Sequence, residues 1–197
     1  MSRLWLTLFA LLSFTLPSLA QTAAFTATPG QGIVAKLTTD LDSTKLKRGD
    51  PIQAQVTHDL KRGHDMLLKK GSIISGKIAK VDPDSIVILF DQIEAAGGQP
   101  QPLNARIGAL APPPGIQTES LQDGRGMAQS NINSATNGDK DVSNAADLSA
   151  ASVGVHGYRG LTLASTTDAG HLYSIIKSAS GDIKLKKGSQ IVLNTPE

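Results

Sequence analysis

Short apolar segments separated by turn residues dominate the first half of this chain and constrain its fold more than any other feature. In 52–57 apolar and polar residues alternate, which is typical of a half-buried strand. Residues 86–90 are continuously apolar and are confined by Asp-Pro-Asp and Gly-Gly, which indicates a strand buried on both faces. No long segment repeats its apolar residues every 3.6 positions. The pattern predicts strands bounded by Gly, Pro, Asp or Ser at 33–38, 52–58, 72–81, 85–93 and 101–109.

The composition changes after residue 110. Residues 111–157 begin Ala-Pro-Pro-Pro-Gly and continue in Ser, Asn, Gly, Asp and Gln, with few large apolar residues to offset the entropy of ordering. We therefore expect a long, disordered, low-complexity linker here, and whether it orders on binding stays open. The last part of the chain, 158–197, is too short to bury a core by itself. It again has strand patterns, at 161–163, 172–176 and 190–193.

These segments together predict the fold class. We expect a mainly β protein, with a compact β-barrel-like or sandwich domain and a long disordered insertion. The β-rich core is expected at 21–110, and the strands of 158–197 are expected to pair with it and complete it. Barrel and sandwich both remain open, because the strand order cannot be deduced from the pattern alone.

The first 20 residues have the organisation of a secretory signal peptide. A basic start, Met-Ser-Arg, precedes 13 uncharged apolar residues at 4–16, and Pro17-Ser18-Leu19-Ala20 follows. We expect cleavage after Ala20 and a periplasmic or secreted protein that meets the membrane only transiently, through this peptide. An uncleaved anchor is the alternative, but a membrane span needs about 20 apolar residues.

Charge and cysteine content exclude several classes of function. The chain has 19 Lys and Arg against 17 Asp and Glu, a net charge of +2, which is too small for a nucleic-acid binder that relies on bulk charge. Ten of the basic residues lie in 36–80, where no aromatic residue is present to stack on bases. We expect no nucleic-acid partner. The absence of Cys excludes disulfides, zinc–thiolate sites and a cysteine nucleophile.

A short basic pattern occurs three times, at 46–52, 68–74 and 185–191. It consists of Leu, two basic residues, Gly, Asp or Ser, a variable residue and Ile. The pattern predicts a solvent-facing turn in which Gly takes a positive φ and Ile begins the next buried strand. Turn formation alone explains the repeated pattern, because pairs of Lys side chains are common on solvent-exposed surfaces. A basic face for an anionic partner is the functional alternative, and its candidate residues are Lys47, Arg48, Lys69, Lys70, Lys186 and Lys187.

Two His-Asp pairs flank Leu-Lys-Arg-Gly, which has the sequence of a hairpin tip. If 59–63 is the loop, His58 and His64 lie opposite each other on one face of two paired strands. With Asp65 they are then candidates for a metal site or for acid–base chemistry. A register shift of one residue would separate them onto opposite faces. We interpret them as solvated turn residues, because a metal site needs a third fixed ligand and none is identifiable.

The motifs of the core follow one another in a characteristic order. GIVAKLTTDLDS at 32–43 is followed by GDPIQAQV at 49–56, by LLKKGS at 67–72 and by ISG at 74–76. This order resembles the β-domain of TrbI-type proteins, which form the core channel of type IV secretion and conjugation machines. A closing strand at 185–193 is similar to that of a set of exported bacterial proteins.

The resemblance covers about 31–110 and 158–194 and implies a shared β-domain, with no catalytic residue. This chain departs from the TrbI-type pattern in two respects. It has a cleavable signal in place of an internal transmembrane helix, and its domain is interrupted at 111–157. The resemblance therefore bears on the fold more than on the role in a secretion machine.

The sequence favours a non-enzymatic function. No Walker A loop, HExxH or GxSxG motif is present, and neither a cofactor nor a metal is predicted. We expect an exported structural or interaction module of the bacterial cell envelope, in a secretion-type assembly, with an envelope protein or a second copy as partner. The alternative is a periplasmic ligand- or metal-binding protein or a hydrolase with a site near His58 and His64.

Overall fold

The computed structural model describes residues 32–95, 98–114 and 147–196. The expected signal peptide, 1–20, and most of the expected linker, 111–157, lie outside these residues. The described part consists of strands, turns and loops, which confirms the prediction of a mainly β fold. No helix long and apolar enough to cross a membrane is found in these three segments.

All eight segments predicted as strands form strands, and five short strands are added to them. The bounds are β1 (Ile33–Leu37), β2 (Leu41–Asp42), β3 (Pro51–Val56), β4 (Leu60–Arg62), β5 (Asp65–Leu68), β6 (Ile73–Asp82), β7 (Ser85–Glu94), β8 (Pro100–Ala111), β9 (Gly154–Val155), β10 (Leu161–Asp168), β11 (His171–Ser178), β12 (Lys184–Leu185) and β13 (Gln190–Asn194).

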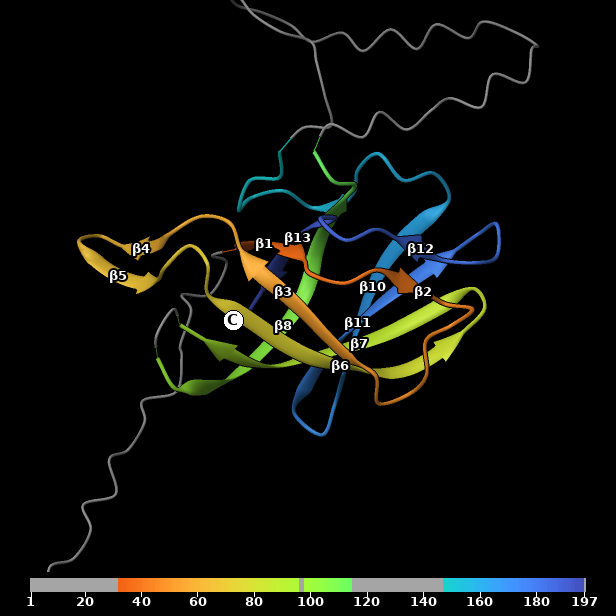
Figure 1. The fold of residues 1–197 in the computed structure, drawn as a ribbon, viewed down its shortest axis with the longest axis horizontal. Coiled ribbons are helices and arrows are strands. Elements are labelled where there is room, and N and C mark those ends of the chain that lie inside the picture. The colour runs from red at the N-terminus through yellow and green to blue at the C-terminus, as the bar shows by residue number, and fades with distance from the viewer. Residues whose placement is uncertain (1–31, 96–97, 115–146, 197) are drawn as a thin grey trace, which may run out of the picture.

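Six of these strands close into an antiparallel barrel (Figure 1). Their order round the barrel is β7, β6, β3, β1, β13 and β8, and β8 pairs in turn with β7. β13 lies between β1 and β8, so a strand from the end of the chain forms part of the barrel wall. Of the two architectures that the sequence left open, barrel and sandwich, the β7–β8 pairing therefore selects the barrel.

Alternate residues of the strands fill the barrel interior. On β3, Ile52, Ala54 and Val56 are buried, whereas Pro51 and Gln53 are exposed, as the alternating sequence predicts. Phe90 in β7 is the largest of the fully buried side chains, with 0% of its surface exposed. Ile and Leu make up most of the remaining core.

Strand β7 pairs with different strands along its length. The segment before Phe90 pairs with β11, and the segment from Phe90 onwards pairs with β8. The β10–β11 hairpin therefore continues the sheet beyond the barrel wall. Four hydrogen bonds hold it beside β8. The N–H of Ile107 donates to Ser174 Oγ at 2.8 Å, and the N–H of Leu172 donates to Asn104 Oδ1 at 2.7 Å. Asn104 Nδ2 donates to the Gly170 carbonyl, and the Arg106 guanidinium donates to Ser165 Oγ, each at 2.9 Å.

Strand β6 approaches β7 most closely at Gly76. A Cβ atom there would meet the carbonyl oxygen of Leu89 and would lie 2.9 Å from Phe90 Cα. The strand register shifts at this point, between Ser75 and Gly76. The residue must be Gly because backbone atoms of the neighbouring strand occupy the space that a side chain would need.

Residues 147–153, which we name the strap, cross the outer surface of the barrel. Leu148 is buried and packs on Val34 and Val192, which belong to a small apolar cluster outside the barrel interior. β9 follows the strap and pairs in parallel with β8. The linker was expected to continue to residue 157. The chain instead rejoins the domain at the strap, because outward-facing apolar residues of β1 and β13 are there for Leu148 to cover.

The insertion lies between the end of β8 and the strap, and both of its ends meet the barrel at Gln190, the first residue of β13. Ala111 at the end of β8 is its partner in the sheet, and the N–H of Leu148 donates to Gln190 Oε1 at 3.1 Å. The polypeptide thus leaves and re-enters the domain at one place.

The β10–β11 hairpin has a two-residue turn, Ala169-Gly170, in which both residues have positive φ, 48° and 80°. This is the type I′ geometry, which strongly prefers Asn-Gly. We expect Ala169→Asn to raise the free energy of unfolding by roughly 0.5–1 kcal/mol, because Ala is strained in the left-handed region. Urea denaturation measures this change. A stability equal to or lower than that of the wild type would contradict the prediction.

Candidate interaction surfaces

The three basic turns have the geometry that their sequence predicts. Gly49, Gly71 and Gly188 have φ values of 92°, 91° and 88°. In each turn the residue after Gly donates its N–H to the carbonyl of the first basic residue, at 3.1, 3.2 and 3.0 Å respectively. A type II turn is defined by a hydrogen bond from the N–H of its fourth residue to the carbonyl of its first, together with a positive φ at its third residue.

Two of these turns, 68–72 and 185–189, share further bonds. In the first, Ser72 Oγ donates to the carbonyl of Lys69 at 2.7 Å, and the N–H of Lys70 donates to Asp59 Oδ1 at 2.8 Å. The second turn has the same two bonds, from Ser189 Oγ to the Lys186 carbonyl at 2.6 Å and from the Lys187 N–H to Asp40 Oδ1 at 2.6 Å. Main-chain atoms and small side chains therefore build both turns, and their lysine side chains are not needed to form them.

Sequence reasoning missed the two aspartates, although a signal for them is present. Asp40 and Asp59 each follow a strand in the pattern Thr-x-Asp, at 38–40 and 57–59. Both Thr side chains also donate to the neighbouring strand, from Thr38 Oγ1 to the Gln53 carbonyl and from Thr57 Oγ1 to the Val34 carbonyl, each at 3.1 Å.

The three turns lie at two ends of the barrel, because β1 and β3 are antiparallel. The N–H of Gly71 donates to Val56 at the end of β3, and that of Gly188 donates to Leu37 at the end of β1. The turn at 46–50 precedes the start of β3, beside the end of β1. The six candidate residues thus form two separate groups: Lys69 and Lys70 at one end, and Lys47, Arg48, Lys186 and Lys187 at the other.

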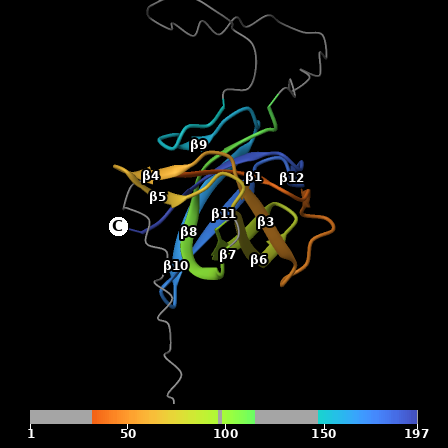
Figure 2. The ribbon, with the colours of Figure 1, turned by 60° about the vertical axis from the view of Figure 1, so that its left-hand side comes forward.

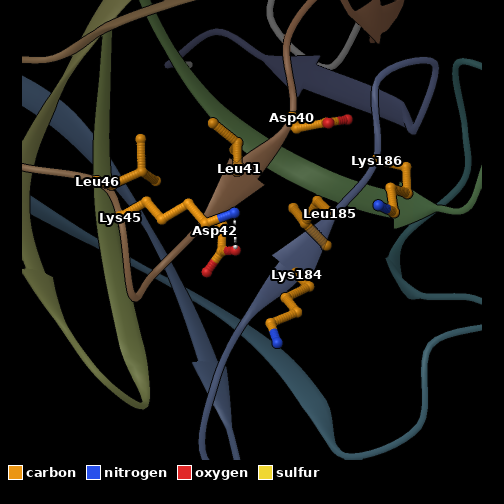
Figure 3. A pocket seen from close by; sticks show the side chains of 8 residues that line it. All are labelled: Asp40, Leu41, Asp42, Lys45, Leu46, Lys184, Leu185 and Lys186. Carbon is orange, nitrogen blue, oxygen red and sulfur yellow. Dashed lines mark ion pairs between the residues drawn. The ribbon is translucent and has the colours of Figure 1, made fainter.

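A shallow pocket of about 300 Å³ lies at the second of these ends, around the paired strands β2 and β12 (Figure 3). Its charged residues are Asp40, Asp42, Lys45, Lys184 and Lys186. Asp42 pairs with Lys45 at 3.5 Å, and hydrogen bonds from the Thr44 hydroxyl and N–H lower the pKa of its carboxyl group. The charges are mixed in sign, and both carboxylates already accept hydrogen bonds within the chain.

The opposite end carries the β4–β5 hairpin, which extends away from the barrel (Figure 1, Figure 2). Its base is apolar, with Leu60 paired to Leu68 and both side chains buried. Towards the tip, Lys61 pairs with Met66, whose side chain is 43% exposed. Met66 was not singled out from the sequence, because a lone Met beside charged residues gives no pattern.

The histidine arrangement considered from the sequence does not form. Residues 60–62 belong to β4, and the turn falls at Gly63 and His64 instead of at 59–63. His64 therefore lies at the tip, whereas His58 lies before β4 and its Nδ1 contacts Thr57 Oγ1 at 2.9 Å. Among the described residues, no three side chains of His, Asp or Glu gather to hold a metal ion.

His58 instead lies at the base of the hairpin, in a pocket of about 330 Å³ that includes Lys36 and Lys70. Lys36 comes from β1 and Lys70 from the turn after β5, so separate elements bring the two cations to one hollow. This grouping could not be deduced from the sequence, where 33 positions separate the two lysines.

Strand β10 is an edge of the sheet. In the described part of the chain it pairs only with β11, in a register without bulges. The Ala179 N–H donates to the Gly160 carbonyl, and antiparallel strands alternate their bonding direction. Leu161, Leu163, Ser165 and Thr167 therefore direct their backbone N–H and carbonyl groups to the open side. Residues 164–168 are exposed.

No protein-family model matches the sequence, and no curated protein matches it. Among solved structures, the chain is similar to ComB10 of the Com type IV secretion system of Helicobacter pylori, with 15% sequence identity and a TM-score of 0.41 over 86% of each chain.

Proposed function

We propose that this protein is an exported, non-enzymatic interaction module of the bacterial cell envelope, which binds a protein partner along the edge of β10 in a secretion-type assembly. The observation that carries the proposal is the open edge of β10. The resemblance of the sequence to TrbI-type domains suggests the kind of assembly. The signal-like first 20 residues suggest the envelope or periplasm as its location.

The edge of β10 lacks the usual blocking residues within the strand itself, although Arg106 of β8 donates to the Ser165 hydroxyl at 2.9 Å. Natural edge strands are blocked by Lys, Pro or bulges, which prevent another strand from pairing with them. From Leu161 to Thr167, β10 has no charged residue, no Pro and no bulge, and it is rich in Thr. An extended segment of a partner can therefore add to the sheet, gaining main-chain hydrogen bonds from the outward-facing N–H and carbonyl groups.

A single substitution tests this edge. Thr167→Pro removes one outward N–H and places a ring beside it, while the bonds to β11 come from the alternate residues. We expect about a tenfold loss of partner binding, because one main-chain hydrogen bond of about 1 kcal/mol is lost and the proline ring obstructs the adjoining part of the partner strand. Size exclusion with light scattering measures the complex, using residues 21–197 with detergent-solubilised envelope extract, and mass spectrometry identifies the partner.

The matched control is Thr167→Ala, which removes the same side chain but keeps the N–H. It should bind the partner as the wild type does, and both variants should melt within a few degrees of it. A Thr167→Pro protein that still forms the full complex would exclude the β10 edge as the contact. A wild-type protein that remains monomeric in the extract would exclude the assembly itself.

A further inference from the structure

The β4–β5 hairpin combines a cationic surface with an exposed apolar residue. Between 58 and 70 it carries four cationic side chains, Lys61, Arg62, Lys69 and Lys70, against Asp59 and Asp65. Asp59 accepts the N–H of Lys70, which keeps its carboxylate in the turn at the hairpin base. Lys36 adds a further cation at the hairpin base. The hairpin end therefore has an excess of positive charge.

Two large apolar side chains are exposed on the described surface, Met66 at 43% and Val153 at 71%, and Met66 is the one on the hairpin. It lies on β5 near the tip, directly opposite Lys61. Leu67, its neighbour, is half-buried and packs against the core. Met66 thus belongs to the β4–β5 hairpin, which protrudes from the barrel (Figure 2).

We propose that the β4–β5 hairpin docks this protein on a membrane surface that contains anionic phospholipids. Met66 enters the interface between headgroups and acyl chains, and Lys69 and Lys70 contact phosphates. The hollow lined by Lys36, His58 and Lys70 has a volume of about 330 Å³ and is open to solvent, so it can receive one headgroup. This surface is distinct from the β10 edge, and the inference does not depend on the proposed protein partner.

A lipid surface fits these residues better than an acidic protein does. The hairpin is narrow, and Met66 is the exposed large apolar residue on it, so it presents little apolar area to a folded partner. An exposed apolar side chain opposite Lys61, on a hairpin with more cations than carboxylates, matches the interface of a membrane, which is apolar below and negatively charged above. If the protein does not bind the vesicles, the remaining interpretation is that the hairpin binds an acidic protein.

The chain supplies its own control for the test. The turns at 68–72 and 185–189 have the same main-chain geometry, the same Ser and Asp bonds and the same two lysines, but only the first adjoins the β4–β5 hairpin. Lys69→Gln/Lys70→Gln and Lys186→Gln/Lys187→Gln therefore make identical changes of charge in equivalent turns. Neither pair should unfold the protein, because the turn bonds come from the main chain and from Ser and Asp side chains.

Vesicle sedimentation of residues 21–197 measures the binding. This segment contains every described strand and lacks the apolar run at 4–16, which would itself insert into lipid. The vesicles contain 40% phosphatidylglycerol in phosphatidylcholine, or phosphatidylcholine alone. We expect binding to the anionic vesicles only, weakened by salt. The 69/70 variant should bind about 30-fold more weakly, since each lysine near the surface contributes about 1 kcal/mol and 1.4 kcal/mol is tenfold.

Two further results decide the assignment. The affinity of the 186/187 variant for the anionic vesicles should fall less than about threefold. The affinity of Met66→Ser should fall several-fold, although its charge is unchanged. Equal losses in the two lysine pairs would overturn the proposal in favour of bulk electrostatics. Unchanged binding by Met66→Ser would also overturn it, as would a wild-type protein that stays in the supernatant with anionic vesicles.

Discussion

Replacing Phe90 by Ala is expected to lower the free energy of unfolding by about 3–5 kcal/mol. Phe90 is 0% exposed and is the largest of the fully buried side chains of the barrel. It stands where β7 changes its partner from β11 to β8, so the cavity left behind would adjoin three strands. A closed barrel cannot collapse around such a cavity without breaking its hydrogen bonds, and the full cost of the cavity should therefore be measured.

Urea unfolding of wild-type and Phe90→Ala proteins gives this difference. Phe90→Leu is the control, because it keeps most of the volume and should cost about half as much or less. A loss below about 1 kcal/mol for the alanine variant would mean that Phe90 does not anchor the core.

The second large effect is expected at Gly76. Gly76→Ala should destabilise the protein by roughly 3 kcal/mol, or prevent folding, because the new methyl group meets backbone atoms of Leu89 and Phe90. Backbone atoms in the middle of a sheet cannot rotate away, so β6 and β7 would have to separate. Thermal unfolding followed by circular dichroism measures the change.

Gly108→Ala provides the comparison for this prediction. Gly108 is also tightly covered, but by the amide group at the end of the Asn194 side chain, which can turn aside. We expect this variant to lose less than half as much stability as Gly76→Ala. If the two variants were equally unstable, the clash with the β7 backbone would not be the reason for the glycine at 76.

The strands of the barrel could be predicted because their patterns are local. Alternation at 52–57 and the continuous apolar run at 86–90 report directly on burial, and both segments form strands where expected. The type II turns were predictable for the same reason, since a single glycine determines each of them. Closure of the barrel was not predictable, because it depends on Phe90 facing Ala105, a pairing between strands that no local pattern specifies.

The candidate site was predicted less well than the fold. The histidine pairing depended on a hairpin register, and moving the turn by a few residues placed His58 at the base and His64 at the tip. Two-residue strands such as β2 and β12 are too short to give a periodic signal. The strap was missed because Leu148 is an isolated apolar residue in a polar segment, and only the outer face of β13 shows why it is buried.

The meeting of both insertion ends at Gln190 has a consequence for how much this chain can be altered. The barrel holds these two ends near each other, and the cost of closing a loop between them grows slowly with its length. We therefore expect the barrel to fold when a further segment is inserted after Pro114. A fluorescent protein or an affinity tag inserted there would report on the location of the protein in the cell, while the β10 edge and the hairpin end keep their native surroundings.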